Sequence, residues 1–518
     1  MDLRRGSMLR QRKLAIETDS KGERATREGE EEDEPVSPVG RLFLEPRFCW
    51  YIVCVLGLGA PVDLAGLRAG IEATLLRHPR FCSVVVMDEL EEGTGPKWVR
   101  TTVELDEHII VPNLDPTAML IEPDRTLEDY LSSLSTLPMD HSRPLWEFHV
   151  LDFPTSEAAA ALAFRAHHSL GDGTSLLSLL VASAGSSKVL PTTAPRRVST
   201  IKALSPRSPS SADKGAMVVF TVWIMSLLLI VWHTIVDIAC FVATAASMLR
   251  DPPALFKGAD GVEFRPKCFL NRKLSLDDIK YVKSVMCCTV NDVLLGVISA
   301  ALSRYYFRKT GETGKRNIKV RSTFIVNLRK MTGLHTLASM MKSGEDNDVK
   351  WGNQLGYMLL PFHIEKHDDP LKYVEKAMRV AHRKKSSMES VFTNWSASMI
   401  QKIFGSKATT SLCYALFKNT TILFSNMVGP TEQVALYGHP ILYIAPSIYG
   451  QPHALTIHYQ SYMNIVKLVL AIDEAQLPNV DGLLEDFIES LKLIREAASG
   501  KPRVVEERSR EEHRHGET

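Results

Sequence analysis

A long apolar segment in the middle of the chain limits what this sequence can fold into more than any other feature. Residues Met217–Trp232 are almost wholly apolar, and the pattern continues to Leu249, interrupted mainly by His233 and Asp237. Crossing a bilayer takes about 20 mostly apolar residues, so the segment is long enough only if one helix continues past His233. Such a helix must be covered by lipid or by protein.

The polar residues of this segment follow a helical pattern. One stripe of the predicted helix carries Ser226, His233, Asp237 and Thr244, which are spaced by seven, four and seven residues. The stripe indicates a face turned toward protein or water. A single crossing would put the two parts of the chain on opposite sides of a membrane, so we expect the helix to lie in or against one leaflet. A buried interdomain helix without lipid contact is the alternative.

Both sides of the apolar segment alternate strand-like and helix-like patterns. The strand candidates are Trp50–Leu56, Phe81–Met87, Ile318–Val326, Tyr357–Ile364 and Asn464–Ile472, and the helix candidates are Leu64–Arg77 and Val293–Arg308. This alternation is typical of an α/β fold. With 518 residues, the chain exceeds what one hydrophobic core usually organises, so two domains are expected.

Composition sets the expected boundaries. Charge-dense ends cannot bury enough apolar surface to fold, and a Ser/Pro/Arg-rich stretch before the apolar segment cannot sustain a regular element. The predicted segments are a disordered tail (1–34), an N-terminal α/β domain (35–185), a flexible linker (186–216), the hydrophobic helix (217–249), a C-terminal α/β domain (260–499) and a second disordered tail (500–518).

The overall charge gives no reason to expect a nucleic acid partner. Lys and Arg number 61 against 60 Asp and Glu, a formal net charge of +1. The eight cysteines show no Cys-x-x-Cys repeat, so no zinc site is predicted. The N-terminal residues lack the apolar core of a secretory signal, so the folded domains are expected to face the cytosol.

The candidate for chemistry is the run His167-His168-Ser169-Leu170-Gly171-Asp172-Gly173. A small, apolar strand-like stretch, Ala158–Ala166, leads into it, and helix-like Thr174–Ala184 follows, so we expect a strand-to-helix loop. A histidine can remove a proton from an alcohol because its reference pKa of about 6.5 leaves it largely neutral near pH 7. Adjacent strand histidines point to opposite faces, which argues against one shared metal ion. Two histidines satisfied within a loop remain the alternative.

The motif resembles a known signature. His-His-x-x-x-Asp-Gly is similar to the active-site motif of the wax ester synthase/diacylglycerol acyltransferase family, within the coenzyme A-dependent acyltransferases. Further blocks resemble this family in the same order: Pro144-Leu145-Trp146, Asn291-Asp292-Val293, Val326-Asn327-Leu328-Arg329, Gly352-Asn353 and Ser425-Asn426-Met427-Val428-Gly429-Pro430. The plant branch of the family is the most similar, because it resembles the Ser37-Pro38 start, the apolar segment after the linker and the block Gly450-Gln451-Pro452.

The resemblance implies a fold and residue roles. It implies two chloramphenicol-acetyltransferase-like α/β domains, with mixed sheets and flanking helices, whose interface forms a tunnel. The second histidine of the motif, His168, is implied to be the general base, with His167 in a supporting role. Asp172 is then a structural anchor for the loop. The resemblance implies acyl-CoA as co-substrate, no bound cofactor and no metal.

Three residues outside the motif are weaker candidates for substrate or oxyanion contacts. Asn291 belongs to a family block, but it and Asp292 precede a predicted helix, where a capping role is the more ordinary one. Ser425 and Asn426 can donate hydrogen bonds, although such pairs also occur in turns.

We therefore expect an acyl-CoA-dependent O-acyltransferase acting on a membrane lipid. The acceptor is a long-chain fatty alcohol, diacylglycerol or both, which gives wax esters or triacylglycerol. The expected location is the endoplasmic reticulum membrane, with the plasma membrane as an alternative. Two rival hypotheses are a soluble acyltransferase acting on small alcohols or amines, and a non-catalytic lipid-binding relative.

Overall fold

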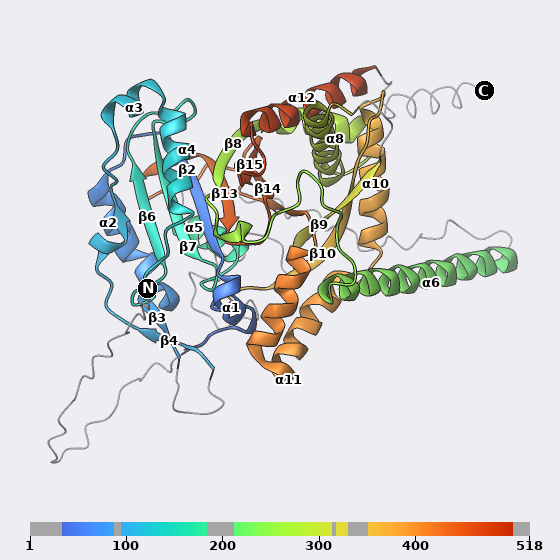
Figure 1. The fold of residues 1–518 in the computed structure, drawn as a ribbon, viewed down its shortest axis with the longest axis horizontal. Coiled ribbons are helices and arrows are strands. Elements are labelled where there is room, and N and C mark those ends of the chain that lie inside the picture. The colour runs from blue at the N-terminus through green and yellow to red at the C-terminus, as the bar shows by residue number, and fades with distance from the viewer. Residues whose placement is uncertain (1–33, 88–94, 184–211, 313–316, 330–350, 501–518) are drawn as a thin grey trace, which may run out of the picture.

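The computed structural model describes residues 34–87, 95–183, 212–312, 317–329 and 351–500 (Figure 1). For residues 212–219 it describes the backbone alone. The predictions of two disordered tails and a flexible linker therefore fall almost entirely outside the described residues.

The first of two large sheets is built mainly from the N-terminal half. Its strand order is β12-β13-β2-β7-β6-β5. All neighbours are antiparallel except β5 and β6. The strands are β2 (Tyr51–Leu58), β5 (Ile109–Ile110), β6 (Trp146–Leu151), β7 (Ala160–His167), β12 (Ala435–Leu436) and β13 (His439–Tyr449).

The second large sheet comes wholly from the C-terminal half. Its order is β10-β9-β11-β14-β15-β8, and β11 is parallel to both of its neighbours. The strands are β8 (Cys268–Ser275), β9 (Ile318–Asn327), β10 (Leu355–Ile364), β11 (Ile422–Val428), β14 (Leu455–Tyr462) and β15 (Ile465–Ile472). Two mixed sheets with flanking helices confirm the predicted fold class.

One long strand links the halves. β13 pairs with β2 along almost its whole length, so the central part of the first sheet depends on residues from the C-terminal half. β13 is followed directly by β14, which lies in the second sheet. The two sheets are therefore connected by covalent chain at the point where they approach each other. No periodicity predicts this exchange, because strand pairing over hundreds of residues leaves no local pattern.

Helices cover the outer faces of both sheets (Figure 1). A small sheet, β1 (Glu34–Pro35), β4 (Lys97–Arg100) and β3 (Ser83–Val86), lies below the first sheet. The helices are α1 (Pro38–Phe43), α2 (Leu64–Ala73), α3 (Pro116–Ile121), α4 (Pro123–Leu134), α5 (Gly173–Ser183), α6 (Ala212–Ala245), α7 (Leu276–Val285), α8 (Val290–Thr310), α10 (Leu371–Lys385), α11 (Glu389–Lys418) and α12 (Val480–Ser499).

Most predicted elements are present, with differences at their ends. The helix predicted over Leu64–Arg77 ends at Ala73, and a separate 3₁₀ turn covers Leu75–Arg77. The strand predicted over Phe81–Met87 is limited to β3, because a 3₁₀ turn that begins at Pro79 occupies its first residues. Proline fixes φ near the helical value and lacks an N–H for a ladder, which favours the turn.

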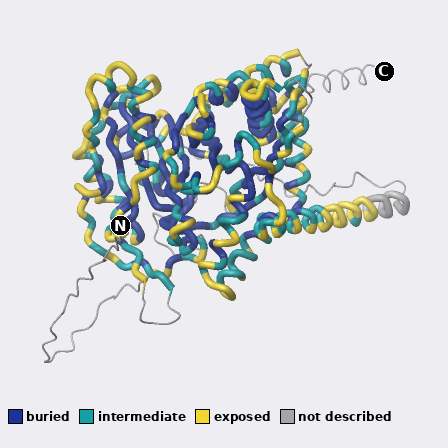
Figure 2. The backbone as a smooth tube through the Cα atoms, viewed as in Figure 1, coloured by how far each residue is buried: buried dark blue, intermediate teal, exposed yellow. Residues whose placement is uncertain are grey.

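The apolar segment forms one long helix, α6, whose N-terminal end projects away from the body of the protein (Figure 1). Residues Phe220–Ala245 are long and apolar enough to cross a membrane by length and composition. Figure 2 shows that most of this helix is exposed, unlike a core helix. The alternative of a buried interdomain helix is therefore wrong.

The C-terminal half of α6 is attached to the protein through the predicted polar stripe. His233 Nδ1 lies 2.7 Å from Ser386 Oγ, and Asp237 pairs with Arg383 and Lys384 at 2.9 Å each. Thr244 is buried and accepts a hydrogen bond from Arg321. These three residues confirm a face turned toward protein. Ser226 is different, since its hydroxyl bonds to the backbone of its own helix.

Candidate active site

The histidine motif joins a central strand to a helix, as predicted. β7 ends at His167 and α5 begins at Gly173, so the residues between them form a short loop. Asp172 caps the helix: its carbonyl oxygen accepts a hydrogen bond from Leu176 N at 3.0 Å, and its carboxylate accepts one from Ser175 N at 2.9 Å. The cap holds the loop and the first turn of α5 as one unit.

Asp172 also links the loop to the C-terminal half. Its Oδ2 accepts hydrogen bonds from Arg329 Nη1 at 2.7 Å and from Gln354 N at 3.0 Å. Both Asp172 and Arg329 are buried, and Arg329 donates a further hydrogen bond to Ser175 Oγ at 2.9 Å. Buried charges are stable when paired and hydrogen-bonded. Both carboxylate oxygens of Asp172 therefore accept hydrogen bonds, and those from Arg329 and Gln354 hold the two halves of the chain together at the site.

The ring of His168 is held in one orientation by the opposite half of the chain. Its Nδ1 lies 3.1 Å from Asn353 Oδ1, while Asn353 Nδ2 donates to the His168 carbonyl oxygen at 2.9 Å. The second contact fixes which end of the amide faces the ring. An amide oxygen only accepts, so Nδ1 of His168 carries the proton and Nε2 holds the free lone pair.

The surroundings of His168 keep it neutral. Burial lowers its pKa, an effect that the nearby Asp172 carboxylate and the hydrogen bond with Asn353 partly oppose. The ring stacks on Phe43 with centroids 4.3 Å apart, and its backbone N–H donates to Trp50 O at 2.9 Å. A neutral imidazole with an available Nε2 is the form that a general base requires.

His167 is arranged differently. Its Nδ1 accepts from Ser169 N at 3.3 Å and lies 2.7 Å from Ser169 Oγ, while Nε2 is 3.4 Å from Cys49 Sγ. Burial, with smaller effects from His141 and His168, lowers its pKa to about 3. Both ring nitrogens are occupied, so of the two adjacent histidines only His168 can offer a nitrogen to a substrate.

His168 lines a cavity of about 280 Å³ between the two halves of the chain, the interdomain cavity. The residues around it come from both large sheets and from α5. They are Ile52, His168, Asp172, Gly173, Thr174, Leu177, Ile325, Asn327, Arg329, Leu355, Ser425, Asn426, Met427, Val428, Pro446, Ser447, Ile448, His458 and Tyr459.

The weaker sequence candidates divide between this cavity and its surroundings. Ser425 and Asn426, on β11, line the cavity. Asn291 does not; its amide oxygen accepts a hydrogen bond from Asn426 Nδ2 and so orients that side chain. The N-cap of α8 is Thr289, so both predicted cap candidates lie inside the first turn of the helix. Asp292 completes a capping box with Thr289, whereas Asn291 has no part in it.

Four residues near the cavity were not predicted as site residues. Asn353 and Arg329 lie within family-like blocks, which was the only signal for them. Ser447 and His458 gave no sequence signal. In the described part of the chain, Ser447 Oγ and His458 Nε2 are buried without a hydrogen-bond partner, and burial lowers the pKa of His458 to about 3. They are therefore neutral polar groups available to a bound substrate.

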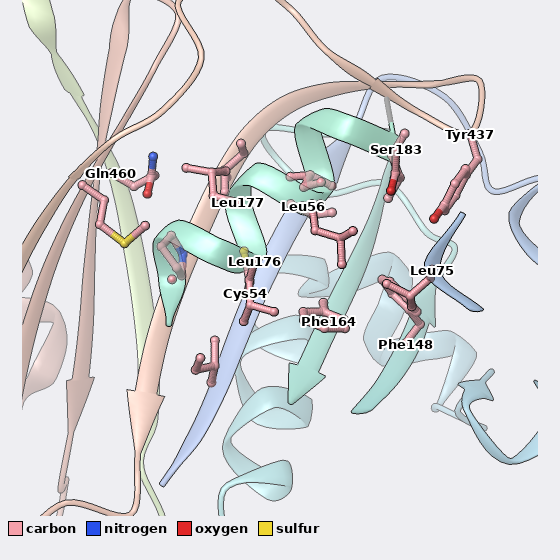
Figure 3. A pocket seen from close by; sticks show the side chains of 18 residues that line it. Cys54, Leu56, Leu75, Phe148, Phe164, Leu176, Leu177, Ser183, Tyr437 and Gln460 are labelled. Atoms are coloured by element: carbon pink, nitrogen blue, oxygen red, sulfur yellow. The ribbon is translucent and has the colours of Figure 1, made fainter. Parts of the chain in front are cut away.

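A second, almost wholly apolar pocket of about 80 Å³ lies between α5 and the first sheet, the α5 pocket (Figure 3). Gly173, Leu177 and Met427 line both this pocket and the interdomain cavity. Figure 3 shows Gln460 and Leu177 toward one end and Ser183 with Tyr437 at the other. The α5 pocket therefore leads away from the neighbourhood of His168 along the helix.

No cluster of three or more His, Cys, Asp or Glu side chains that could hold a metal ion occurs within the described residues. The charged groups at the site, Asp172 and Arg329, pair with each other. What the arrangement offers chemically is the two neutral imidazoles of His168 and His458, further hydrogen-bonding groups and an adjoining apolar pocket.

Solved structures identify the class to which this fold belongs. The wax ester synthase/diacylglycerol acyltransferase from Marinobacter aquaeolei VT8 is similar with a TM-score of 0.55 at 18% identity, covering 90% of this chain and 100% of that one. The first condensation domain of the CDA synthetase is similar with a TM-score of 0.53 at 12% identity, covering 90% and 96%. The fold is that of the two-domain coenzyme A-dependent acyltransferases and condensation domains.

Sequence comparison identifies the family. Residues 56–294 match the wax ester synthase/diacylglycerol acyltransferase catalytic domain, and residues 351–495 match the WS/DGAT C-terminal domain. Wax ester synthase/diacylglycerol acyltransferase 11 of Arabidopsis thaliana is 40% identical over 478 residues, which covers 90% of this chain and 95% of the relative. Wax ester synthase/diacylglycerol acyltransferase 5 of the same plant is 39% identical over 487 residues, covering 90% and 94%. The chain belongs to this family and is an acyltransferase.

Proposed function

We propose that the protein transfers a fatty acyl group from acyl-CoA to the hydroxyl of a long-chain alcohol, of diacylglycerol or of both, with His168 as general base. The observation that carries this proposal is the geometry of His168. Asn353 holds its Nδ1 proton, burial keeps the ring neutral, and the ring borders a cavity shared by both halves of the chain.

The proposed reaction needs one proton acceptor. The acceptor alcohol donates its hydroxyl proton to His168 Nε2 as its oxygen attacks the thioester carbonyl carbon. The new C–O bond forms, the tetrahedral oxyanion collapses, and the C–S bond breaks. The imidazolium then returns the proton to the coenzyme A thiolate. Ser425 and Asn426 are the proposed hydrogen-bond donors to the oxyanion, and the contact with Asn291 orients the amide of Asn426.

The proposed place for a fatty chain is the α5 pocket. Its lining is apolar, and it shares Gly173 and Met427 with the interdomain cavity, so a chain in the α5 pocket can have its carboxyl end near His168. A Cβ added to Gly173 would lie 2.8 Å from Met427 Sδ, closer than ordinary contact. A glycine at this position therefore keeps the junction of the two spaces open.

The acceptors we propose are lipids that partition into membranes, and α6 supports a membrane location for the enzyme. Between Phe220 and Trp232 it exposes mainly apolar side chains. We propose that α6 lies in one leaflet of the endoplasmic reticulum membrane, with the plasma membrane as the alternative, and that both large sheets lie on the cytosolic side. The shared cavity supports this topology, because a site built from both halves needs them on the same side.

The deciding experiment is expression in a yeast strain without its own neutral-lipid synthesis, fed with fatty alcohol. Wax esters and triacylglycerol are then separated and quantified. The wild-type chain should restore at least one of these lipids, and the ratio between them defines the preferred acceptor. His168→Ala should reduce ester synthesis by about 10² to 10⁴-fold, the usual contribution of a general base.

A second histidine provides the matched control. His363, on β10, is half-buried and does not border the interdomain cavity. His363→Ala should therefore retain near-normal synthesis at equal protein level. Near-normal synthesis by His168→Ala would show that His168 is not the base. Efficient use of short soluble alcohols with no lipid product would favour the small-acceptor hypothesis.

A further inference from the structure

The exposed apolar side chains of the described residues are concentrated on two neighbouring helices. α6 and α11 pack against each other and together carry more than half of the large apolar side chains that are exposed. The members on α6 are Phe220, Val222, Trp223, Met225, Leu227, Leu228, Leu229, Val231, Trp232, Ile235 and Val242, and those on α11 are Val391, Trp395, Met399, Ile403, Phe404 and Leu412. Exposed apolar surface on this scale, on two helices that pack together, is typical of contact with another apolar phase.

α11 is a helical hairpin with an apolar tip. Gly405 has φ 79° and ψ 177°, outside the helical region, and the two halves of the helix fold back on each other at this residue (Figure 1). Ile403 and Phe404, next to the bend, are 64% and 68% exposed. A bend that places two large apolar side chains at its outermost point is costly in water and favourable in lipid.

The charges near this surface match the surface of an anionic membrane. Between residues 390 and 418 the α11 hairpin has no acidic residue, while Lys402 and Lys407 are exposed on either side of the tip. Asp237, the acidic residue of α6 whose side chain the structure describes, is paired with Arg383 and Lys384. Lysines at the edge of an apolar face bind phospholipid headgroups while the apolar side chains enter the acyl region.

An apolar pocket of about 190 Å³ opens between α6 and the α11 hairpin, the α6–α11 pocket. Its lining comes from the C-terminal part of α6, from both halves of the hairpin and from Tyr357. Val242 and Leu412 line it and are also exposed, so the pocket opens onto the apolar surface itself. A hydrocarbon chain can enter it from lipid without crossing water.

The inner end of this pocket adjoins the surroundings of His168. The Tyr357 ring lies 5.3 Å from that of Phe417, Phe417 lies 4.8 Å from Trp50, and Trp50 lies 6.2 Å from His168. Tyr357, Phe417 and Trp50 belong to one buried apolar cluster, and Phe241 of α6 packs against it. Packed aromatic side chains therefore lie between the inner end of the pocket and the base.

We propose that α6 and the α11 hairpin are the membrane-docking face, and that the α6–α11 pocket admits the hydrocarbon chain of the lipid acceptor from the bilayer toward His168. The pocket is then separate from the α5 pocket, so acyl donor and acceptor approach the base from different sides. This inference rests on the proposed acyl transfer to a lipid hydroxyl.

Vesicle binding tests the docking face. The purified full-length protein is titrated with phosphatidylcholine vesicles, with and without phosphatidylserine, and the bound fraction is measured by flotation. The double variant Ile403→Asp/Phe404→Asp should partition at least about tenfold more weakly, because two large apolar side chains no longer enter the lipid. The control Leu120→Asp/Ile121→Asp changes two still more exposed apolar residues on α3, far from α11, and should bind like the wild type.

Acceptor choice tests the pocket. Esters are measured with one acyl-CoA and two acceptors, hexadecanol in vesicles and hexanol in solution. Ala397→Phe and Ala245→Leu fill the pocket from its two sides. Each should lower the hexadecanol-to-hexanol rate ratio at least about tenfold, which corresponds to excluding two or more methylene groups. Thermal unfolding and the hexanol rate show whether each variant is folded.

The outcomes separate this inference from the proposed function. An unchanged rate ratio in both pocket variants overturns the entry route, and equal vesicle binding by the tip variant overturns the docking face. Self-association of the wild type that is lost in the tip variant, without vesicle binding, would show that the face binds a second copy instead. A wild-type protein that forms no ester from either alcohol would overturn the proposed function, while flotation would still decide the docking face.

Discussion

Replacing Asp172 by Asn tests whether the motif aspartate holds the two halves of the site together. The carboxylate accepts three hydrogen bonds, from Ser175 N, Gln354 N and Arg329 Nη1, at 2.7 to 3.0 Å. In Asp172→Asn one oxygen becomes an NH₂ group, and the Arg329 guanidinium loses its charge partner while it stays buried. Breaking a buried ion pair from one side costs about 3–5 kcal/mol, so we expect the free energy of unfolding to fall by that amount.

Denaturant unfolding, followed by circular dichroism and by tryptophan fluorescence, measures this change. Trp351, whose Nε1 donates to Leu170 O at 2.7 Å, is one of the seven tryptophans that contribute to the fluorescence and lies where the motif loop meets the C-terminal half. Arg329→Met and the double variant Asp172→Asn/Arg329→Met complete a cycle. The double variant should lose at least about 2 kcal/mol less than the sum of the two single variants.

Two results would refute this reasoning. One is a loss below about 1 kcal/mol for Asp172→Asn, the range of an exposed pair. The other is strict additivity in the cycle, which would mean that Asp172 and Arg329 do not stabilise each other.

The residual activity of Asp172→Asn should also change its dependence on pH, in a direction that the contacts of His168 determine. The carboxylate raises the pKa of His168, so its removal should move the acid limb to lower pH.

Three further predictions follow from the same contacts. Asn353→Asp places a negative charge beside Nδ1 of His168, which should raise the pKa of that ring. The acid limb of the pH profile of kcat/KM should then move higher by about one pH unit or more. An acid limb at the same pH would contradict the assignment of His168 as the base. Ser183→Phe blocks the far end of the α5 pocket and should shift the preferred acyl-CoA to shorter chains, at about fourfold per methylene excluded, in competition assays with mixed chain lengths. Burial lowers the pKa of His167 and of His458 to about 3, so both stay neutral in the folded protein while the unfolded chain takes up protons below pH 6.5. The free energy of unfolding should therefore be unaffected by these two histidines above pH 6.5, and it should fall by about 1.4 kcal/mol per pH unit for each of them as the pH drops toward 3. Coincident unfolding curves at about pH 7 and about pH 5.5 would disprove this prediction.

Local sequence patterns were sufficient for much of this protein. The strand before the motif, the loop and the helix after it follow from a small apolar run, two glycines and an apolar helical period, and β7 and α5 lie where these features predict them. The polar stripe of the apolar segment likewise predicted that His233 and Asp237 face protein or water, and both contact protein. Such features are readable because they depend on residues a few positions apart.

The tertiary structure alone decided how the site is assembled. The partner of His168, Asn353, lies 185 residues further along the chain, and the partner of Asp172, Arg329, lies 157 residues further. Apart from the resemblance to family blocks, no pattern in the neighbouring sequence indicates that Asn353 and Arg329 belong to the site. Which of two adjacent histidines has an available nitrogen also depends on these distant contacts.

The same limit applies to the surface that meets the membrane. The sequence predicted an apolar helix with one polar stripe over residues 217–249, and the structure has this helix as α6, Ala212–Ala245. Only the folded chain shows that the α11 hairpin lies beside α6, that Gly405 turns its apolar tip outward and that a pocket opens between them. Periodicity encodes which face of a helix is apolar. Which surface of the protein that apolar face packs against depends on segments far away in the sequence, so no pattern within the helix itself predicts it.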